Sequence, residues 1–185
     1  GLDSSEQMHI QFTNNAAKEN IDPERFRLLL CDILDPKAQV EIRDELHEEF
    51  GNQRLQLIIS AFTLHHFSKA EKEKVFRVVF ELLEPGGVFL LGDLFNYGGE
   101  SPWLTETIFN WEISWISENF RTRALAEHKN GDDAKASNLE RLRKEWLHHY
   151  LEDNHLDSVS THFDLLKNVG FTEAGNPFRY WQVGL

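Results

Sequence analysis

Cysteine and long hydrophobic runs are what this chain of 185 residues has least of. Cys31 is its only cysteine. A lone thiol can form no internal disulfide and no cysteine-based zinc site, so we expect a cytoplasmic protein without a metal. The strongest apolar runs, Val88–Leu91 and Leu57–Ile59, are far shorter than the roughly 20 residues that span a bilayer. No secretory hydrophobic segment opens the sequence either, so we expect no membrane partner.

Basic residues are also scarce. The chain has 19 Lys and Arg against 31 Asp and Glu, a net charge of -12. A field of this sign repels phosphate backbones, which disfavours a nucleic-acid partner without excluding a local basic patch. We therefore expect a small-molecule partner. The sequence leaves a homo-oligomer open.

Strand-like and helix-like segments alternate in the first half of the chain. The apolar runs Phe26–Cys31, Leu55–Phe62 and Val88–Gly92 are typical of buried parallel strands. Pro36 ends the first run, and helical spacing follows over Val40–Phe50. The strands Leu55–Phe62 and Val88–Gly92, with the helix expected between them, form a βαβ unit. The predicted class is therefore α/β.

The helix between the second and third of these strands has clear signals. Ser68 and Glu71 have the spacing of a capping box, and Glu84–Gly87, with the sequence Glu-Pro-Gly-Gly, should end the helix. Between them we expect an apolar stripe facing the core, made of Val75, Val79 and Leu82, with Phe76 and Leu83 alongside.

Residues 97–156 differ in character and contain four of the five tryptophans. Two helices are expected here, separated at Asn130–Asp133. Stripes at helical spacing normally face a core, and a cover over a bound substrate is the alternative. The members of these stripes are Leu104, Ile108, Trp111 and Trp115, then Leu139, Leu142, Trp146 and Tyr150.

The tail returns to the first pattern. Asp157 or Ser158 should cap a helix that Gly170 ends, followed by two antiparallel strands, Phe171–Ala174 and Phe178–Leu185. We therefore divide the chain into a partial α/β core (1–96), a helical insertion (97–156) that would cover a substrate, and the end of the same core (157–185).

Acidic residues stand where predicted strands stop. In open α/β sheets, ligands bind beyond the carboxyl ends of the strands, and Asp3, Asp32 and Asp93 lie at such ends. One carboxylate can accept hydrogen bonds from both ribose hydroxyls, and another can accept from an adenine amino group. The pattern suits a nucleoside ligand.

Four segments, in this order, resemble class I methyltransferases that depend on S-adenosylmethionine. The resemblance covers residues 1–95 and about 157–185, and each motif is weaker than the ordered set. It implies a three-layer Rossmann-like fold, with a mainly parallel sheet and an antiparallel C-terminal strand, that transfers a methyl group to an unidentified acceptor. The segments are Gly1–Met8, Leu57–Phe67, Leu82–Asp93 and Leu165–Phe171.

The resemblance assigns the adenosine contacts to the start of the chain. Asp3, with Ser4 beside it, would bind the ribose hydroxyls, and Met8 would pack on the adenine face. Asp32 would accept from the adenine amino group, with the Ile33 backbone beside it. Without a ligand, the two acids are turn or capping residues and Met8 fills a core gap.

The resemblance also places Ala61 and Phe62, just past the fourth strand, near the methionine part and the reacting methyl group. One element of the family is not found. Its first strand and glycine-rich loop should precede Gly1 by some twenty residues and belong at the centre of the sheet. We expect that such a segment exists in the intact protein; otherwise the chain is catalytically inactive.

Methyl transfer depends mainly on positioning, with a base only where the acceptor must lose a proton. His65, His66 and Asp93 are the candidates, because histidine serves this role near neutral pH. The alternative is that one histidine packs inward and its neighbour outward.

Two other functions stay open. The helix pair and the tail around Ser158–Arg179 are similar to enzymes that modify the tRNA wobble uridine with a carboxylated derivative of S-adenosylmethionine, although the acidic charge opposes this. The other is a non-catalytic methyltransferase-like module that serves a partner subunit.

Overall fold

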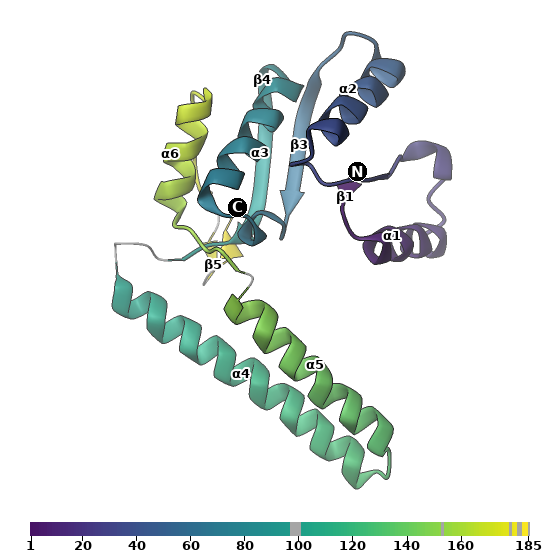
Figure 1. Ribbon diagram of the computed structural model, residues 1–185, viewed down its shortest axis with the longest axis vertical. Coiled ribbons are helices and arrows are strands. Elements are labelled where there is room, and N and C mark those ends of the chain that lie inside the picture. Colours follow the sequence, from purple (N-terminus) through teal and green to yellow (C-terminus); the bar gives the residue numbers. More distant parts are fainter. Residues whose placement is uncertain (97–100, 153, 178, 181–182, 185) are drawn as a thin grey trace. The chain divides into compact units, whose positions relative to one another are not determined.

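The computed structural model describes residues 1–96, 101–152, 154–177, 179–180 and 183–184. Tyr97, Phe178 and Leu185, which bound predicted segments, lie outside this part. The fold is mixed α/β, as predicted (Figure 1). In chain order the elements are β1 (Leu2–Asp3), α1 (Glu6–Lys18), η1 (Pro23–Arg25), β2 (Leu29–Leu30), α2 (Pro36–Phe50), β3 (Leu55–Ala61), η2 (Leu64–His66), α3 (Lys69–Leu82), β4 (Leu83–Leu94), α4 (Pro102–Lys129), α5 (Asp133–Glu152), α6 (Val159–Val169), β5 (Arg179–Tyr180) and β6 (Val183–Gly184).

The described strands form two sheets. β1 and β2 are a parallel pair, with Leu2 opposite Leu29 and Asp3 opposite Leu30. The second sheet has the order β3-β4-β6-β5, and β6 runs antiparallel to both of its neighbours. The predicted strand Phe171–Ala174 is wrong, because both closing strands lie after residue 178. Within the other predicted strand, 178–185, the described residues form two short strands, β5 and β6, that pair with each other.

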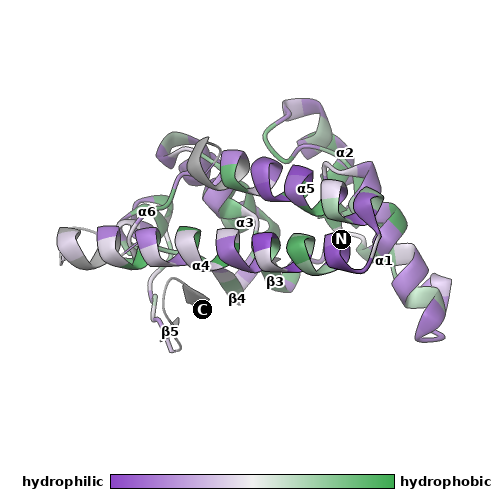
Figure 2. Ribbon diagram, turned by 90° about the horizontal axis from the view of Figure 1, so that it is seen from below, coloured by the Kyte–Doolittle hydropathy of each residue, from purple (hydrophilic) through white to green (hydrophobic). Residues whose placement is uncertain are grey.

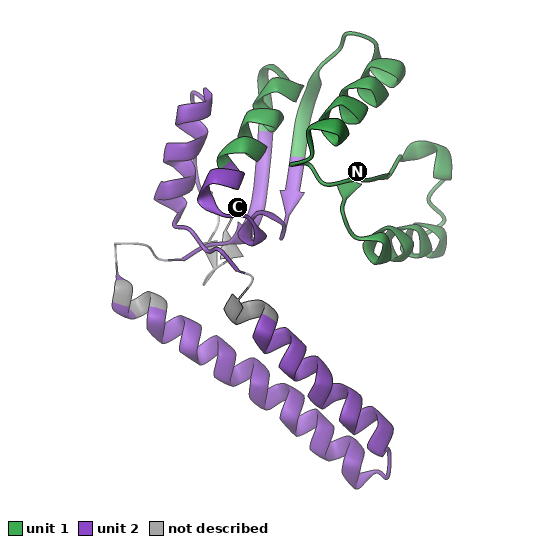
Figure 3. Cartoon of the chain, in the orientation of Figure 1, with its two compact units in different colours: residues 1–58, 73–88 green, residues 59–72, 89–185 purple. Residues whose placement is uncertain are grey.

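Residue contacts divide the chain into two compact units (Figure 3). The first contains residues 1–58 and 73–88, and the second contains residues 59–72 and 89–185. The boundary crosses β3, α3 and β4, so the first half of β3 and the second half of β4 belong to different units.

Capping and an apolar stripe define α3. The backbone N–H of Ser68 donates to Oε2 of Glu71 at 2.8 Å, and the N–H of Glu71 faces Oγ of Ser68 at 3.4 Å, which is the predicted capping box. The predicted stripe is buried at Val75, Phe76, Val79 and Leu83.

Strand β4 starts earlier than predicted and includes the Glu84–Gly87 turn sequence. Gly86 has a φ of +83°, a conformation that glycine adopts without penalty. A Cβ on Gly87 would lie 3.1 Å from the Leu55 carbonyl of β3. The two glycines therefore let the chain turn directly from α3 into a strand that passes close to β3.

Helix α2 also begins earlier than its apolar spacing indicated. Asp35 is the N-cap, with its side chain accepting from the N–H of Lys37, and Pro36 occupies the first turn. Proline suits this position because its missing N–H has no partner inside a helix. Pro36 thus opens α2 as well as ending the strand-like run before it, and Phe26–Cys31 contributes only the two residues of β2.

Helices α4 and α5 lie side by side as an antiparallel hairpin (Figure 1). The predicted break is confirmed, with Gly131 at a φ of +80° between the helices. Ile108 and Leu139 are buried, but Trp103, Trp111 and Trp115 are 72%, 49% and 56% exposed. The core interpretation is therefore wrong for Trp111 and Trp115 of the predicted stripe, because a two-helix hairpin can bury only the facing side of each helix.

Hydrophilic residues predominate along α5 (Figure 2). In the part of the chain that the structure describes, no helix has both the length and the apolar character needed to cross a membrane.

Candidate functional site

His65 and Asp93 form a buried pair where β3 and β4 end in the second unit. His65 is in η2, and Asp93 is the penultimate residue of β4. Nδ1 of His65 lies 2.5 Å from Oδ1 of Asp93, and the two residues are 7% and 1% exposed. The backbone N–H of Leu64 donates to the other carboxylate oxygen at 2.6 Å. The structure therefore brings two of the three predicted base candidates into direct contact.

Hydrogen bonding decides the charge of Asp93. Burial alone would raise its pKa, but hydrogen bonds from His65, Leu94 and Leu64, together with the charge of His65, outweigh burial and lower the pKa below its ordinary value of 3.8. Asp93 is thus an ionised carboxylate at neutral pH and can only accept hydrogen bonds. Nδ1 of His65 must carry the hydrogen between them, so in the neutral form of the ring the lone pair lies on Nε2.

His66 differs from its neighbour. Its side chain is exposed, and its ring centroid lies 3.9 Å from that of His65, with the ring planes tilted by 50°. The expectation that one histidine packs inward and the other outward therefore describes their burial, although the two rings are in contact.

Phe62 joins β3 to η2 in a strained conformation. Its φ is +51°, in the left-handed region that residues with a Cβ rarely adopt, and its side chain is 56% exposed. The N–H of Phe62 donates to the carbonyl of Gly92 in β4 at 2.8 Å, which fixes this backbone. Ala61, the last residue of β3, is exposed as well. Strained residues of this kind are frequent at functional sites.

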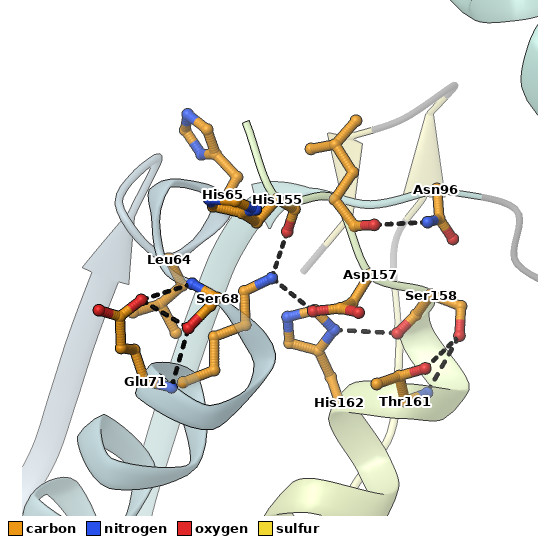
Figure 4. A network of polar contacts seen from close by, with 12 residues as sticks. Leu64, His65, Ser68, Glu71, Asn96, His155, Asp157, Ser158, Thr161 and His162 are labelled. Carbon is orange, nitrogen blue, oxygen red and sulfur yellow. Dashed lines mark hydrogen bonds and ion pairs between the residues drawn. The ribbon is translucent and has the colours of Figure 1, made fainter. Parts of the chain in front are cut away.

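A second polar cluster adjoins His65, and the sequence analysis did not identify it. Lys72 of α3 is wholly buried, and its Nζ lies 2.6 Å from Oδ2 of Asp157, which precedes α6 (Figure 4). One signal was present: Lys72 stands three, four and seven residues before Val75, Phe76 and Val79, so it lies on the apolar face of α3.

His162 lies in the same region. It is buried in α6, where Nδ1 lies 2.9 Å from the Ser158 carbonyl oxygen and the ring packs edge-on against Phe95. Burial lowers its pKa below 6.5, and the charge of Lys72 acts in the same direction. The hydrogen bond to Ser158 and the charges of Asp157 and Asp93 oppose the shift.

The predicted adenosine contacts lie in the first unit. Asp3 ends β1, and its Oδ1 accepts from the N–H of Ser5 at 2.8 Å. Asp32 follows β2, and its Oδ1 accepts from the N–H of Leu34 at 2.9 Å. Since Asp3 is opposite Leu30 in a parallel pair, Asp3 and Asp32 lie at the same end of the pair. Each carboxylate also has a second oxygen, Oδ2.

The other predicted contacts of this unit are near these acids in the chain. Ser4 is exposed, and Met8 is 49% exposed in the first turn of α1, so Met8 does not fill a core gap. The carbonyl of Ile33 accepts from the side chain of Gln39 at 2.9 Å.

A surface hollow of about 510 Å³ lies beside Leu55, at the start of β3, and includes no residue that we predicted as functional. Among the described residues, no group of three or more His, Cys, Asp and Glu side chains could hold a metal ion.

No model of a known protein family matches the chain, and no curated protein matches its sequence. A functional assignment therefore depends on the geometry of these residues and on the motif resemblance.

Proposed function

We propose that the chain is part of a Rossmann-like methyltransferase that transfers a methyl group from S-adenosylmethionine to a small-molecule acceptor. The observation that carries the proposal is the register of β1 and β2, in which Asp3 and Asp32 share one end of a parallel pair. Acids at the carboxyl ends of neighbouring parallel strands are suited to a nucleoside.

The order of the strands supports the same fold. In the methyltransferase fold, the strand that we did not find in the sequence belongs between the counterparts of β1 and β3, and the last strand is antiparallel. The sheets β1-β2 and β3-β4-β6-β5 are separate here, and β6 is antiparallel to its neighbours. The antiparallel direction of β6 agrees with the last strand of that fold.

The two acids fit an adenosine chemically. Each uses Oδ1 for a backbone N–H two residues later, so Oδ2 can accept from a ribose hydroxyl at Asp3 and from the adenine amino group at Asp32. S-adenosylmethionine supplies an activated methyl group. Toward an acceptor that carries a proton, Nε2 of His65 would take the proton, while Asp93 keeps the ring in the required tautomer.

Binding of S-adenosylhomocysteine to the full-length protein, measured by calorimetry, tests the proposal. Asp3→Asn and Asp32→Asn retain a carbonyl oxygen for the turn but replace Oδ2 with a donor. Each should weaken binding about 10-fold to 100-fold, the equivalent of one charged hydrogen bond. Asp22→Asn is the matched control, because Asp22 makes the same contact with the N–H of Glu24 at 3.0 Å.

Absence of binding to the folded wild-type protein would contradict the enzyme proposal and favour a non-catalytic module. The acceptor is tested separately, with labelled S-adenosylmethionine offered together with hydroxylated aromatic compounds or with stripped tRNA. We expect transfer to the small molecules, because the net charge of -12 opposes an RNA backbone.

A further inference from the structure

Lys72 is the most deeply buried charged residue among the described side chains, with 0% exposure. Its Nζ donates to Oδ2 of Asp157 at 2.6 Å and to the backbone carbonyl of His155. Both acceptors lie between α5 and α6, more than 80 residues further along the chain. A buried ammonium group is tolerated only with such partners, so this contact depends on the segment that follows the hairpin.

Residues 155–158, which we call the return segment, are tied on their other side as well (Figure 4). The side chain of Asn96 donates to the Leu156 carbonyl at 2.5 Å, and the N–H of Asn96 donates to the Asp157 carbonyl at 3.1 Å. A parallel bridge joins Asn96 to Ser158. The end of β4 and the chain leaving α5 are thus held together at the base of the hairpin.

The return segment also reaches the proposed base. The N–H of His155 donates to the carbonyl of His65 at 2.6 Å. His65 belongs to η2, a helix of three residues whose N-cap residue, Thr63, provides no side-chain cap. Since so short a helix has few hydrogen bonds of its own, the contact from His155 adds a restraint on the backbone of His65.

We propose that Lys72 is a positioning residue for the His65–Asp93 pair. Lys72 holds the carbonyl of His155, the N–H of His155 then holds the backbone of His65, and the His65 ring stays against Asp93 with Nε2 directed to the acceptor. The same contacts hold the return segment beside this pair. The inference rests on the proposed function for the role of Nε2, but the coupling can be measured without a substrate.

The alternative is an ion pair that only stabilises the fold. Lys72→Met tests this, together with the double variant Lys72→Met/Asp157→Asn, which leaves no unpaired buried charge and should fold if the single variant does not. Lys74→Met is the control, because Lys74 lies on the same helix and is exposed. The readouts are the ¹⁵N shifts of the His65 ring, which report its tautomer, and hydrogen exchange at the His155 amide.

In the wild-type protein and in Lys74→Met, the shifts should show a single tautomer with the hydrogen on Nδ1. In either Lys72 variant we expect both tautomers and at least 10-fold faster exchange at His155 than in Lys74→Met. A folded double variant that keeps one tautomer and a protected His155 amide would overturn the proposal. Binding of S-adenosylhomocysteine by the wild-type protein is a separate readout, so a failure of the proposed function would be recognised independently.

Discussion

Nδ1 of His65 and Oδ1 of Asp93 lie 2.5 Å apart, although 28 residues separate them in the sequence. One residue follows β3 and the other nearly ends β4. The pair arises because neighbouring strands of one sheet bring their ends together, so that two residues far apart in the sequence form one hydrogen-bonded pair.

Replacing Asp93 with Asn should destabilise the protein. The carboxylate accepts from Leu64, His65 and Leu94, and an amide has only one acceptor oxygen. At least one buried donor loses its partner, at a cost of about 1–3 kcal/mol in the free energy of unfolding. Urea unfolding measures this, with Asp164→Asn, at an exposed position of α6, as the control. If Asp93→Asn and Asp164→Asn were equally stable, the carboxylate of Asp93 could not be a buried acceptor of these hydrogen bonds.

The same carboxylate should contribute to acid sensitivity. Because the folded-state pKa of Asp93 is lowered from 3.8, its contribution to stability is present above pH 3.8 and is lost as the pH falls through the lower, folded-state pKa. The acid limb of the stability curve, measured by urea unfolding below pH 4, should be flatter in Asp93→Asn than in Asp164→Asn.

His162 predicts a pH effect in a different range. Burial lowers its pKa in the folded protein below 6.5, so the unfolded chain binds a proton more readily than the folded one. Stability is therefore full above pH 6.5 and decreases as the pH falls from 6.5 toward the folded-state pKa. At pH 8, His162→Leu should lower the free energy of unfolding by about 1 kcal/mol, because it removes the hydrogen bond to Ser158.

Between pH 7 and 5, His162→Leu should also show a flatter stability curve than the wild-type protein in urea unfolding. Leu125→Ala, at a non-titrating position of α4 that is 52% exposed, should keep the wild-type slope. An unchanged slope in His162→Leu would mean that other groups cause the pH dependence.

Local signals account for the parts of the fold that could be predicted. The Ser68–Glu71 capping box and the stripe of α3 are confirmed. So is the cap of α6, where Ser158 accepts from the N–H of Thr161 and Gly170 ends the helix at a φ of +127°. Each depends on residues within about one turn of each other, which is the range that sequence patterns describe well.

Long-range pairing accounts for the rest. The Lys72–Asp157 contact joins α3 to a segment 85 residues later, and spacing along one helix gives no information about such a partner. The predicted strand at Phe171–Ala174 is wrong for a similar reason, because a segment forms a strand only where a neighbouring strand is available for pairing. The exposure of Trp115 depends on which side of α4 meets α5.

The α4–α5 hairpin should have a small core of its own. Leu139→Ala removes a buried side chain and should cost about 2–4 kcal/mol in the free energy of unfolding. Leu125→Ala, at a position 52% exposed on α4, should cost less than about 0.5 kcal/mol. Urea unfolding followed by circular dichroism at the helix band compares the two variants. Equal losses would mean that the helices do not pack through Leu139.

The left-handed backbone at Phe62 predicts an unusual order of stability. Phe62→Gly and Phe62→Ala both remove the ring, but only glycine adopts a φ of +51° without strain. The glycine variant should be more stable than the alanine variant by about 1 kcal/mol. At Ala61, the last residue of the strand, Ala→Gly should instead destabilise by about 0.5–1 kcal/mol. If S-adenosylhomocysteine contacts the ring, both Phe62 variants should weaken its binding equally, since the lost ring is common to them. An alanine variant as stable as the glycine variant in thermal unfolding would show that the backbone at residue 62 relaxes and that the strain is not held by the fold.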